Sequence, residues 1–135
     1  MSTLTLTLLF ISASSTFKLP PDLLKSLCYV ESGHKVEAIH YADGVGNSLG
    51  VCQIKLTTAK QLGFRGTEKQ LMEPNTNIYY AAKYLAHQRD RYAGSIEKAV
   101  IAYNIGSAKH LQHTKYSARV IKEWKQQEVA VNEWR

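Results

Sequence analysis

The stretch PPDLLKSLCYVESG, at residues 20–33, decides the fold assignment. Two prolines and an aspartate form a helix-start signal, and the leucine, cysteine and valine residues that follow recur at helical spacing. Gly33 stands directly after the last predicted turn, where glycine commonly terminates a helix. The pattern therefore predicts a helix from about Pro21 to Glu31 that ends in a sharp turn.

Glu31 differs from most acidic residues of this chain, because it follows the apolar residues 27–30 and precedes that turn. A carboxylate at a helix C-terminus faces the negative end of the helix dipole, which disfavours ionisation. Burial against apolar groups also raises the pKa of a carboxyl group. A raised pKa is what a general acid needs near neutral pH. Taken alone, an acid at a helix end is more often a structural residue, so this argument makes Glu31 only a candidate.

The rest of the chain reads as helices joined by polar turns. Residues 34–56 are rich in glycine and irregular, with a short strand expected around residues 51–54. Further helices are predicted at residues 58–62 after a Thr57 or Thr58 cap, 76–92 after an Asn75 cap, 96–104 after a Ser95 cap, and 115–127. We predict a mostly α, single-domain protein with one Gly-rich loop and strand excursion after the first of these helices.

Residues 1–17 allow two interpretations. The apolar run LTLTLLFI at residues 4–11, followed by small residues, resembles the core and cleavage end of a secretory signal. The usual basic start is missing, because no Lys or Arg precedes Lys18, and the run is too short to span a bilayer. Alternating Thr and Leu at residues 3–8 leaves a strand as the structural alternative.

The length of 135 residues and mass of 15.2 kDa suit one domain. We divide the chain into a signal or N-terminal segment at residues 1–17, the domain itself at residues 18–127, and a short tail at residues 128–135.

The chain is basic, with 17 Lys and Arg against 11 Asp and Glu and a net charge of +6. Such a charge suits a polyanionic partner, whether nucleic acid, an anionic membrane surface or the carboxylate-bearing bacterial wall. No nucleic-acid-binding motif is present in the sequence, so we expect no nucleic-acid partner.

The two cysteines, Cys28 and Cys52, lack the spacing of metal ligands, and we expect neither a metal site nor a cofactor. Two buried free thiols are the favoured interpretation. One disulfide is the alternative if the protein is exported.

Beyond the first helix, five sequence blocks occur in the order and at the spacing of the soluble lytic transglycosylase domain. The sequence resembles that family over about residues 20–121. The blocks are ESG at 31–33, SLGVCQI at 48–54, TAKQLG at 58–63, LMEPNTNI at 71–78 with AAKYL at 81–85, and AVIAYNIG at 99–106 followed by a Tyr116 to Val120 element. One such block would be weak, whereas five in order are specific.

The resemblance implies a lysozyme-like α fold and cleavage of the MurNAc-β-1,4-GlcNAc bond of peptidoglycan. By similarity, Glu31 protonates the glycosidic oxygen and then acts as a base on the C6 hydroxyl of the same MurNAc, which closes on C1 to give a 1,6-anhydro sugar. Ordinary glycosidases need a second carboxylate, and here the substrate supplies the nucleophile instead. Ser48 stands where some lysozymes carry an aspartate, and the nearest candidate to replace it is Asp43, in a Gly-rich turn where Asp usually bonds its own backbone.

Five further positions match the family as substrate-binding residues. Gln53 is expected to hydrogen-bond the substrate in the cleft, and Ser48 either bonds the substrate or fixes its loop. The Tyr103 hydroxyl is expected close to the catalytic acid, with Asn104 near the sugar or the backbone. Tyr116 matches a late tyrosine that lines the cleft. Packing or helix capping is the alternative role for each tyrosine and for Asn104.

The chain departs from the family pattern after Gln53 and Ile54, where Lys55 and Leu56 stand in place of the usual Met and Pro. Lys55 would place a positive charge on the wall of the cleft. Such a charge favours a peptide-bearing glycan with free carboxylates.

Two rival functions share the fold: a hydrolytic goose-type lysozyme, and a non-catalytic wall-binding or assembly protein. A chain of this kind also resembles small transglycosylases that open the wall for secretion or conjugation machines, and phage-encoded wall enzymes. We accordingly expect a monomer whose partner is the peptidoglycan glycan strand. Its place of action would be the periplasm or cell envelope, or the host wall for a phage enzyme.

Overall fold

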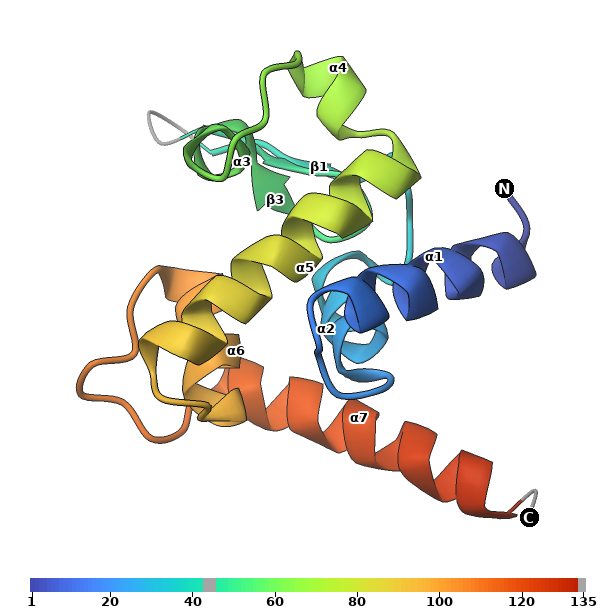
Figure 1. Ribbon diagram of the computed structural model, residues 1–135, viewed down its shortest axis with the longest axis vertical. Helices are drawn as coiled ribbons and strands as arrows, with labels where there is room; N and C mark the ends of the chain where they lie inside the picture. Colours follow the sequence, from blue (N-terminus) through green and yellow to red (C-terminus); the bar gives the residue numbers. More distant parts are fainter. Residues whose placement is uncertain (43–45, 134–135) are drawn as a thin grey trace.

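The computed structural model describes residues 1–42 and 46–133, with side chains through residue 128. Within these residues, the molecule is mostly helical and carries one small antiparallel sheet, as predicted (Figure 1). The helices are α1 (Thr3–Thr16), α2 (Leu23–Ser32), α3 (Leu56–Gln61), α4 (Glu68–Leu71), α5 (Pro74–Arg91), α6 (Ile96–Ile105) and α7 (Lys115–Glu133). The strands are β1 (Ile39–His40), β2 (Ser48–Leu49) and β3 (Ile54–Lys55).

Helix α5 runs through the middle of the molecule and packs against both α1 and α6 (Figure 1). Its apolar residues recur at spacings of three and four, so that Ile78, Ala81 and Leu85 are buried in the main core. The helix begins at Pro74, earlier than the expected cap at Asn75, because proline suits the first turn of a helix.

Helix α1 forms where the sequence pattern allowed a signal or a strand, and the strand alternative is wrong. Leu6, Phe10 and Ala13 lie one helical turn apart and are buried in the core shared with α2 and α5. Burial of this stripe outweighs the weak strand preference of the alternating threonines. Across the described residues, no helix combines the length and the apolar character that a membrane span requires.

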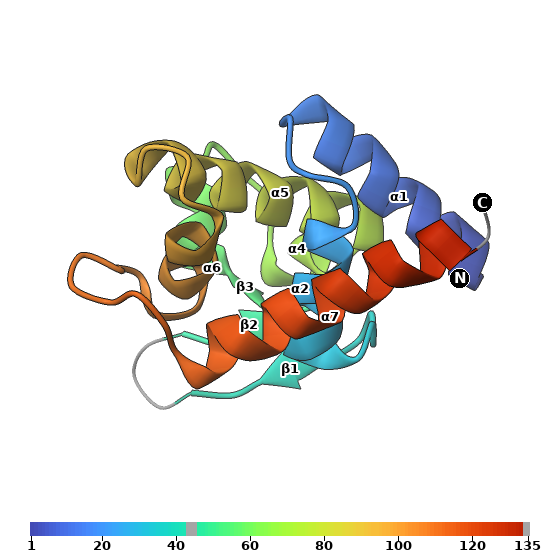
Figure 2. The same cartoon turned by 90° about the horizontal axis from the view of Figure 1, so that it is seen from below.

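Helix α7 crosses α2 and α6, and it is longer than the predicted 115–127 (Figure 2). Its backbone stays helical through Glu133, into the segment that the sequence assigns to a short tail. Val120 is fully buried, and Trp124 Nε1 donates a hydrogen bond to the Pro21 carbonyl at 2.8 Å. Helix α7 therefore packs against α2 and fixes the segment just before it through this hydrogen bond.

The sheet lies between α2 and α3 in the sequence, where the Gly-rich excursion was expected. Strand β2 occupies the centre, with Leu49 opposite Ile39 of β1 and Ile54 of β3. The predicted strand at 51–54 is wrong in part, because residues 50–53 form the turn between β2 and β3. The expected threonine cap of α3 is also wrong, since Lys55 holds that position.

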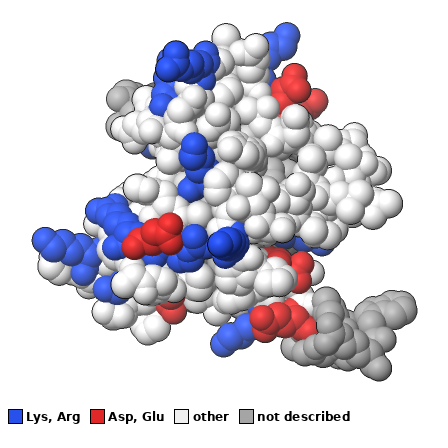
Figure 3. Space-filling model, in the orientation of Figure 1, with Lys and Arg blue, Asp and Glu red and all other residues white. Residues whose placement is uncertain are grey.

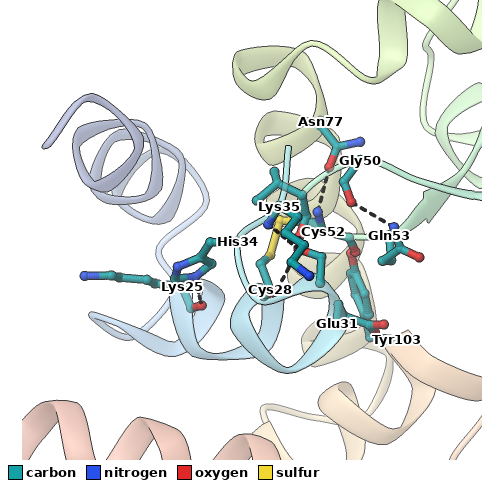
Figure 4. Close-up of a disulfide and its surroundings, with 12 residues drawn as sticks. Lys25, Cys28, Glu31, His34, Lys35, Gly50, Cys52, Gln53, Asn77 and Tyr103 are labelled. Carbon is teal, nitrogen blue, oxygen red and sulfur yellow. Dashed lines mark hydrogen bonds between the residues drawn. A yellow bond between two sulfur atoms is a disulfide. The ribbon is translucent and has the colours of Figure 1, made fainter. Parts of the chain in front are cut away.

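Cys28 of α2 and Cys52 of the 50–53 turn form a disulfide, so the expectation of two free thiols is corrected (Figure 4). Both residues are completely buried, and their Cα atoms lie 4.4 Å apart, within the range for a disulfide. The pairing follows from the packing of α2 against this turn, which spacing in the sequence does not reveal. The bond ties the helix that carries Glu31 to the turn that carries Gln53.

Candidate active site

Glu31 occupies the last turn of α2, and the helix ends one residue later, before Gly33 with its positive φ of 67°. The Glu31 side chain is half-buried, and its Oε2 accepts a hydrogen bond of 2.6 Å from the Tyr116 hydroxyl. Tyr116 stands at the start of α7, 85 residues further along the chain. The carboxyl group is therefore fixed between two packed helices.

Burial raises the pKa of the Glu31 carboxyl above its ordinary value of 4.5. The Tyr116 hydrogen bond and the positive charge of Arg119 act in the opposite direction and offset part of that rise. Desolvation disfavours the charged carboxylate, so the group keeps its proton at a higher pH than an exposed glutamate does. A half-buried acid with a single hydrogen-bond donor is suited to give up a proton and take one back.

Glu31 opens onto a cleft of about 360 Å³. Ser48, Gln53, Tyr103 and Asn104, four of the predicted substrate-binding residues, line the cleft with it. Lys55, Tyr84 and the residues Ile54, Thr58, Ile105 and Gly106 complete the lining. The structure thus brings together residues of α2, the small sheet and α6 that lie more than 70 positions apart in the sequence.

Gln53 is held in a left-handed backbone conformation, with φ of 56°. Such a conformation is costly for a residue other than glycine and tends to occur at functional sites. Gln53 Nε2 donates to the Gly50 carbonyl at 2.9 Å (Figure 4). The same nitrogen donates to the Ala38 carbonyl at 3.1 Å, and the two bonds fix the side chain at the cleft wall. Both of these bonds use the amide nitrogen, and the amide oxygen is the acceptor that remains for a ligand.

The Tyr103 hydroxyl was expected close to the acid, and Tyr116 was expected to line the cleft; the structure gives each hydroxyl a different hydrogen-bond partner. The Tyr103 hydroxyl donates to the Cys52 carbonyl at 2.7 Å, so it fixes the disulfide turn, and the hydrogen bond to the acid comes from Tyr116. Tyr103 nonetheless lies beside Glu31 (Figure 4), and burial together with the charge of Glu31 raises its pKa well above 10.0. Its hydroxyl therefore stays protonated and keeps donating to the turn.

Asn77 is a supporting residue that the sequence reasoning missed. Completely buried on α5, it accepts from the Cys52 backbone N–H at 2.9 Å and donates to the carbonyls of Leu49 (2.8 Å) and Leu71 (3.0 Å). A Cβ atom on Gly50 would lie 2.4 Å from the Asn77 amide nitrogen, so only glycine fits there. The sequence did carry a signal for Asn77: it is a polar residue on the apolar face of α5, one turn before Ala81. A polar side chain buried at such a position needs hydrogen-bond partners.

Glu31 is the only carboxylate among the described residues that line the cleft. Asp43, the candidate for a second acid in the sequence analysis, lies outside the described residues. No cluster of three His, Cys, Asp or Glu side chains suitable for a metal ion occurs in the described part of the chain.

Comparison with known proteins finds both sequence relatives and a solved structure of similar fold. Among curated relatives, the X polypeptides of Escherichia coli and of its strain K12 are each 33% identical over 99 residues, which is 72% of this chain and 58% of the relative. The chain thus spans little more than half the length of these relatives. A solved structure of an inactive mutant of the lytic transglycosylase Slt from Pseudomonas aeruginosa matches with a TM-score of 0.64 and 22% identity. That match covers 86% of this chain and 21% of the other, and it shows a shared fold.

The model of the family described as the transglycosylase SLT domain matches residues 8–126, which is most of the chain. The matched range includes Glu31 and every residue that lines the cleft. It also begins inside α1, which packs into the main core. The chain belongs to the transglycosylase SLT domain family.

Proposed function

We propose that this protein is a lytic transglycosylase that cleaves the MurNAc-β-1,4-GlcNAc bond of peptidoglycan and leaves a 1,6-anhydroMurNAc end. The observation that carries the proposal is the half-buried Glu31 carboxyl, with its raised pKa, at the wall of a polar cleft. Family membership supports peptidoglycan as the substrate.

In the first step, protonated Glu31 donates its proton to the glycosidic oxygen as the bond from that oxygen to C1 of MurNAc breaks. The Tyr116 hydroxyl, 2.6 Å from Oε2, stabilises the carboxylate that results. Burial raises the pKa of the Glu31 carboxyl above 4.5 and so favours the protonated form that general-acid catalysis requires.

In the second step, the Glu31 carboxylate removes the proton from the C6 hydroxyl of the same MurNAc, and that oxygen bonds to C1. The enzyme regains its proton, no water is consumed, and no second carboxylate is needed. Most glycosidases use a second carboxylate at this step, whereas here the C6 hydroxyl of the substrate would take that part.

Ser48, Gln53, Tyr103 and Asn104 are the residues that we assign to substrate positioning. The Gln53 oxygen would accept a hydrogen bond from a sugar hydroxyl or amide. The Tyr103 ring would form part of the floor, because its hydroxyl is already bonded to Cys52. Insoluble glycan strands would be the partner, and the periplasm or cell envelope would be the place of action, in a secretion, conjugation or phage setting.

The test is digestion of purified peptidoglycan by the wild type and by Glu31→Gln, with the sugars identified by mass spectrometry. Anhydro ends from the wild type alone are the expected result. Reducing MurNAc ends would instead identify a hydrolytic lysozyme of the goose type. If neither protein released products, a wall-binding role would replace the enzymatic one.

A further inference from the structure

A second hollow, of about 440 Å³, adjoins the catalytic cleft. Thr58, Tyr84 and Gly106 line both hollows, so a glycan strand seated in the cleft passes directly beside the second one. We call this hollow the side pocket; His87, Gln88 and Arg91, on the C-terminal half of α5, form its other polar wall. The volume falls within the range of about 300 to 1,000 Å³ that is usual for ligand pockets.

The side pocket is positively charged. Arg91 lies one helical turn after His87, and none of the described residues that line the pocket is an aspartate or glutamate. Arg89, two positions earlier, is paired with Asp90 at 3.0 Å, whereas Arg91 has no carboxylate partner in the described part of the chain. Lys and Arg side chains also outnumber Asp and Glu over the face drawn in Figure 3. The pocket therefore offers a cation that the protein does not neutralise.

The Arg91 guanidinium is held in place from one side. Its Nη1 donates to the Gly106 carbonyl at 2.9 Å and to Gln88 Oε1 at 3.3 Å, and Gln88 itself is only 3% exposed. Both bonds use the same nitrogen, so the N–H groups on Nη2 and Nε remain for a ligand. A positioned guanidinium presents a planar fork that matches a carboxylate in two parallel hydrogen bonds.

The position of the pocket indicates which carboxylate it would meet. A group that branches from a glycan lying in the cleft would reach the side pocket past the shared residues Thr58, Tyr84 and Gly106. The MurNAc unit of peptidoglycan carries such a branch, a short peptide stem with free carboxylates. We propose that the side pocket binds a carboxylate of the stem peptide through Arg91 and His87, which makes peptide-bearing glycan the preferred substrate. This inference rests on the proposed function and assigns a substrate class to the same groove.

The experiment compares two substrates: glycan chains with intact peptide stems, and the same chains after an amidase has removed the stems. The variants are Arg91→Gln, His87→Gln as a second change that touches no backbone carbonyl, and Arg65→Gln as the matched control. Arg65 is an exposed arginine between α3 and α4 that lines neither hollow. Thermal unfolding of each variant checks that the contact from Arg91 to Gly106 is not needed for folding.

For Arg91→Gln we expect kcat/KM on peptide-bearing glycan to fall about tenfold more than on stripped glycan, as the loss of one charge-assisted hydrogen bond implies. His87→Gln should give a smaller loss with the same preference, and Arg65→Gln should change neither rate. Equal losses on the two substrates, or the same selective loss for Arg65→Gln, would overturn the inference.

Binding measurements separate this inference from the proposed function. In the Glu31→Gln background, sedimentation with the two glycans should show tighter binding to the peptide-bearing form. Arg91→Gln should reduce that preference and leave only the part that Lys55 supplies from the cleft wall. If the wild type released no anhydro ends but the preference persisted, the proposed function would fail and the side pocket would stand. Anhydro ends with no dependence of binding on Arg91 would support the proposed function and overturn the assignment of the side pocket.

Discussion

Two hollows of similar size differ in what surrounds them. The one between α1 and the start of α2, of about 310 Å³, is lined largely by apolar side chains such as Phe10, Ile11 and Leu19. The catalytic cleft, of about 360 Å³, is lined by the Glu31 carboxyl and by amide, hydroxyl and ammonium groups. Size alone would not choose between them. The cleft is the candidate site because it holds a partly desolvated acid with a hydrogen-bond donor, whereas the α1–α2 hollow adds Asp22 and Lys25 to a mainly apolar wall.

Exchanging a carboxyl for an amide in each hollow should give the largest contrast. Glu31→Gln is expected to lower kcat on peptidoglycan by about 100- to 10,000-fold, the usual contribution of a general acid. Asp22→Asn, at the wall of the α1–α2 hollow, should leave kcat unchanged, because Asn also tolerates the positive φ of 65° found there. Release of soluble muropeptides measures both. If kcat fell by a similar factor in both variants, the cleft could not be distinguished from the α1–α2 hollow as the catalytic site.

The second-largest effect is expected from removing the disulfide beside the cleft, which should lower the free energy of unfolding. The double variant Cys28→Ala/Cys52→Ala is expected to lose about 2 to 5 kcal/mol of unfolding free energy, because the cross-link joins α2 to the turn before Gln53. Ser15→Ala, an exposed change in the α1–α2 hollow, serves as the control and should have little effect. Denaturant unfolding gives both values; an unchanged midpoint for the double variant would contradict this role.

Tyr116→Phe should have a smaller effect with a defined sign. The Tyr116 hydrogen bond lowers the pKa of Glu31 against the larger effect of burial, so its loss should raise that pKa further. The falling limb of the pH–rate profile, where the acid form is lost, should then move to higher pH, with kcat about tenfold lower for want of one hydrogen bond to a charged group. Tyr29→Phe, on the exposed side of α2, is the control. A shift to lower pH would contradict the assignment.

The smallest expected effect concerns stability. Because the folded state raises the pKa of Glu31, ionising this group above its ordinary pKa of 4.5 costs folding free energy. Glu31→Gln should therefore be no more stable than the wild type below pH 4.5 and increasingly more stable as the pH rises through the folded pKa. Thermal melts across this pH range measure the difference in stability between the variant and the wild type. If the advantage of Glu31→Gln became smaller as the pH rises, the pKa of Glu31 would be lowered by folding and the prediction would be wrong.

Local sequence signals predicted the elements that local forces determine. The end of α2 at Gly33 and the Ser95 cap of α6 were predicted because glycine and serine act through their nearest neighbours. The apolar stripe of α5 was visible for the same reason. Of the residues that the five ordered blocks assigned to the cleft, the structure places Glu31, Ser48, Gln53, Tyr103 and Asn104 along it, and it leaves Tyr116 outside the lining.

Contacts between distant segments were beyond such signals. The disulfide depends on how α2 packs against the 50–53 turn, and the hydrogen bond from Tyr116 to Glu31 depends on where α7 crosses α2. The strand alternative for residues 3–8 failed because burial of α1 in the core was not visible in the alternation itself. Tertiary packing decides each of these points.

The most direct test of Glu31 as the catalytic acid is a titration of its carboxyl by carbon-13 NMR in the free protein, with Glu31→Gln used to assign the signal. We expect a midpoint clearly above the ordinary value of 4.5, which would show that the cleft keeps this carboxyl protonated and ready to act as an acid. A midpoint at or below 4.5 would show an ordinary solvated carboxylate and would contradict the central claim.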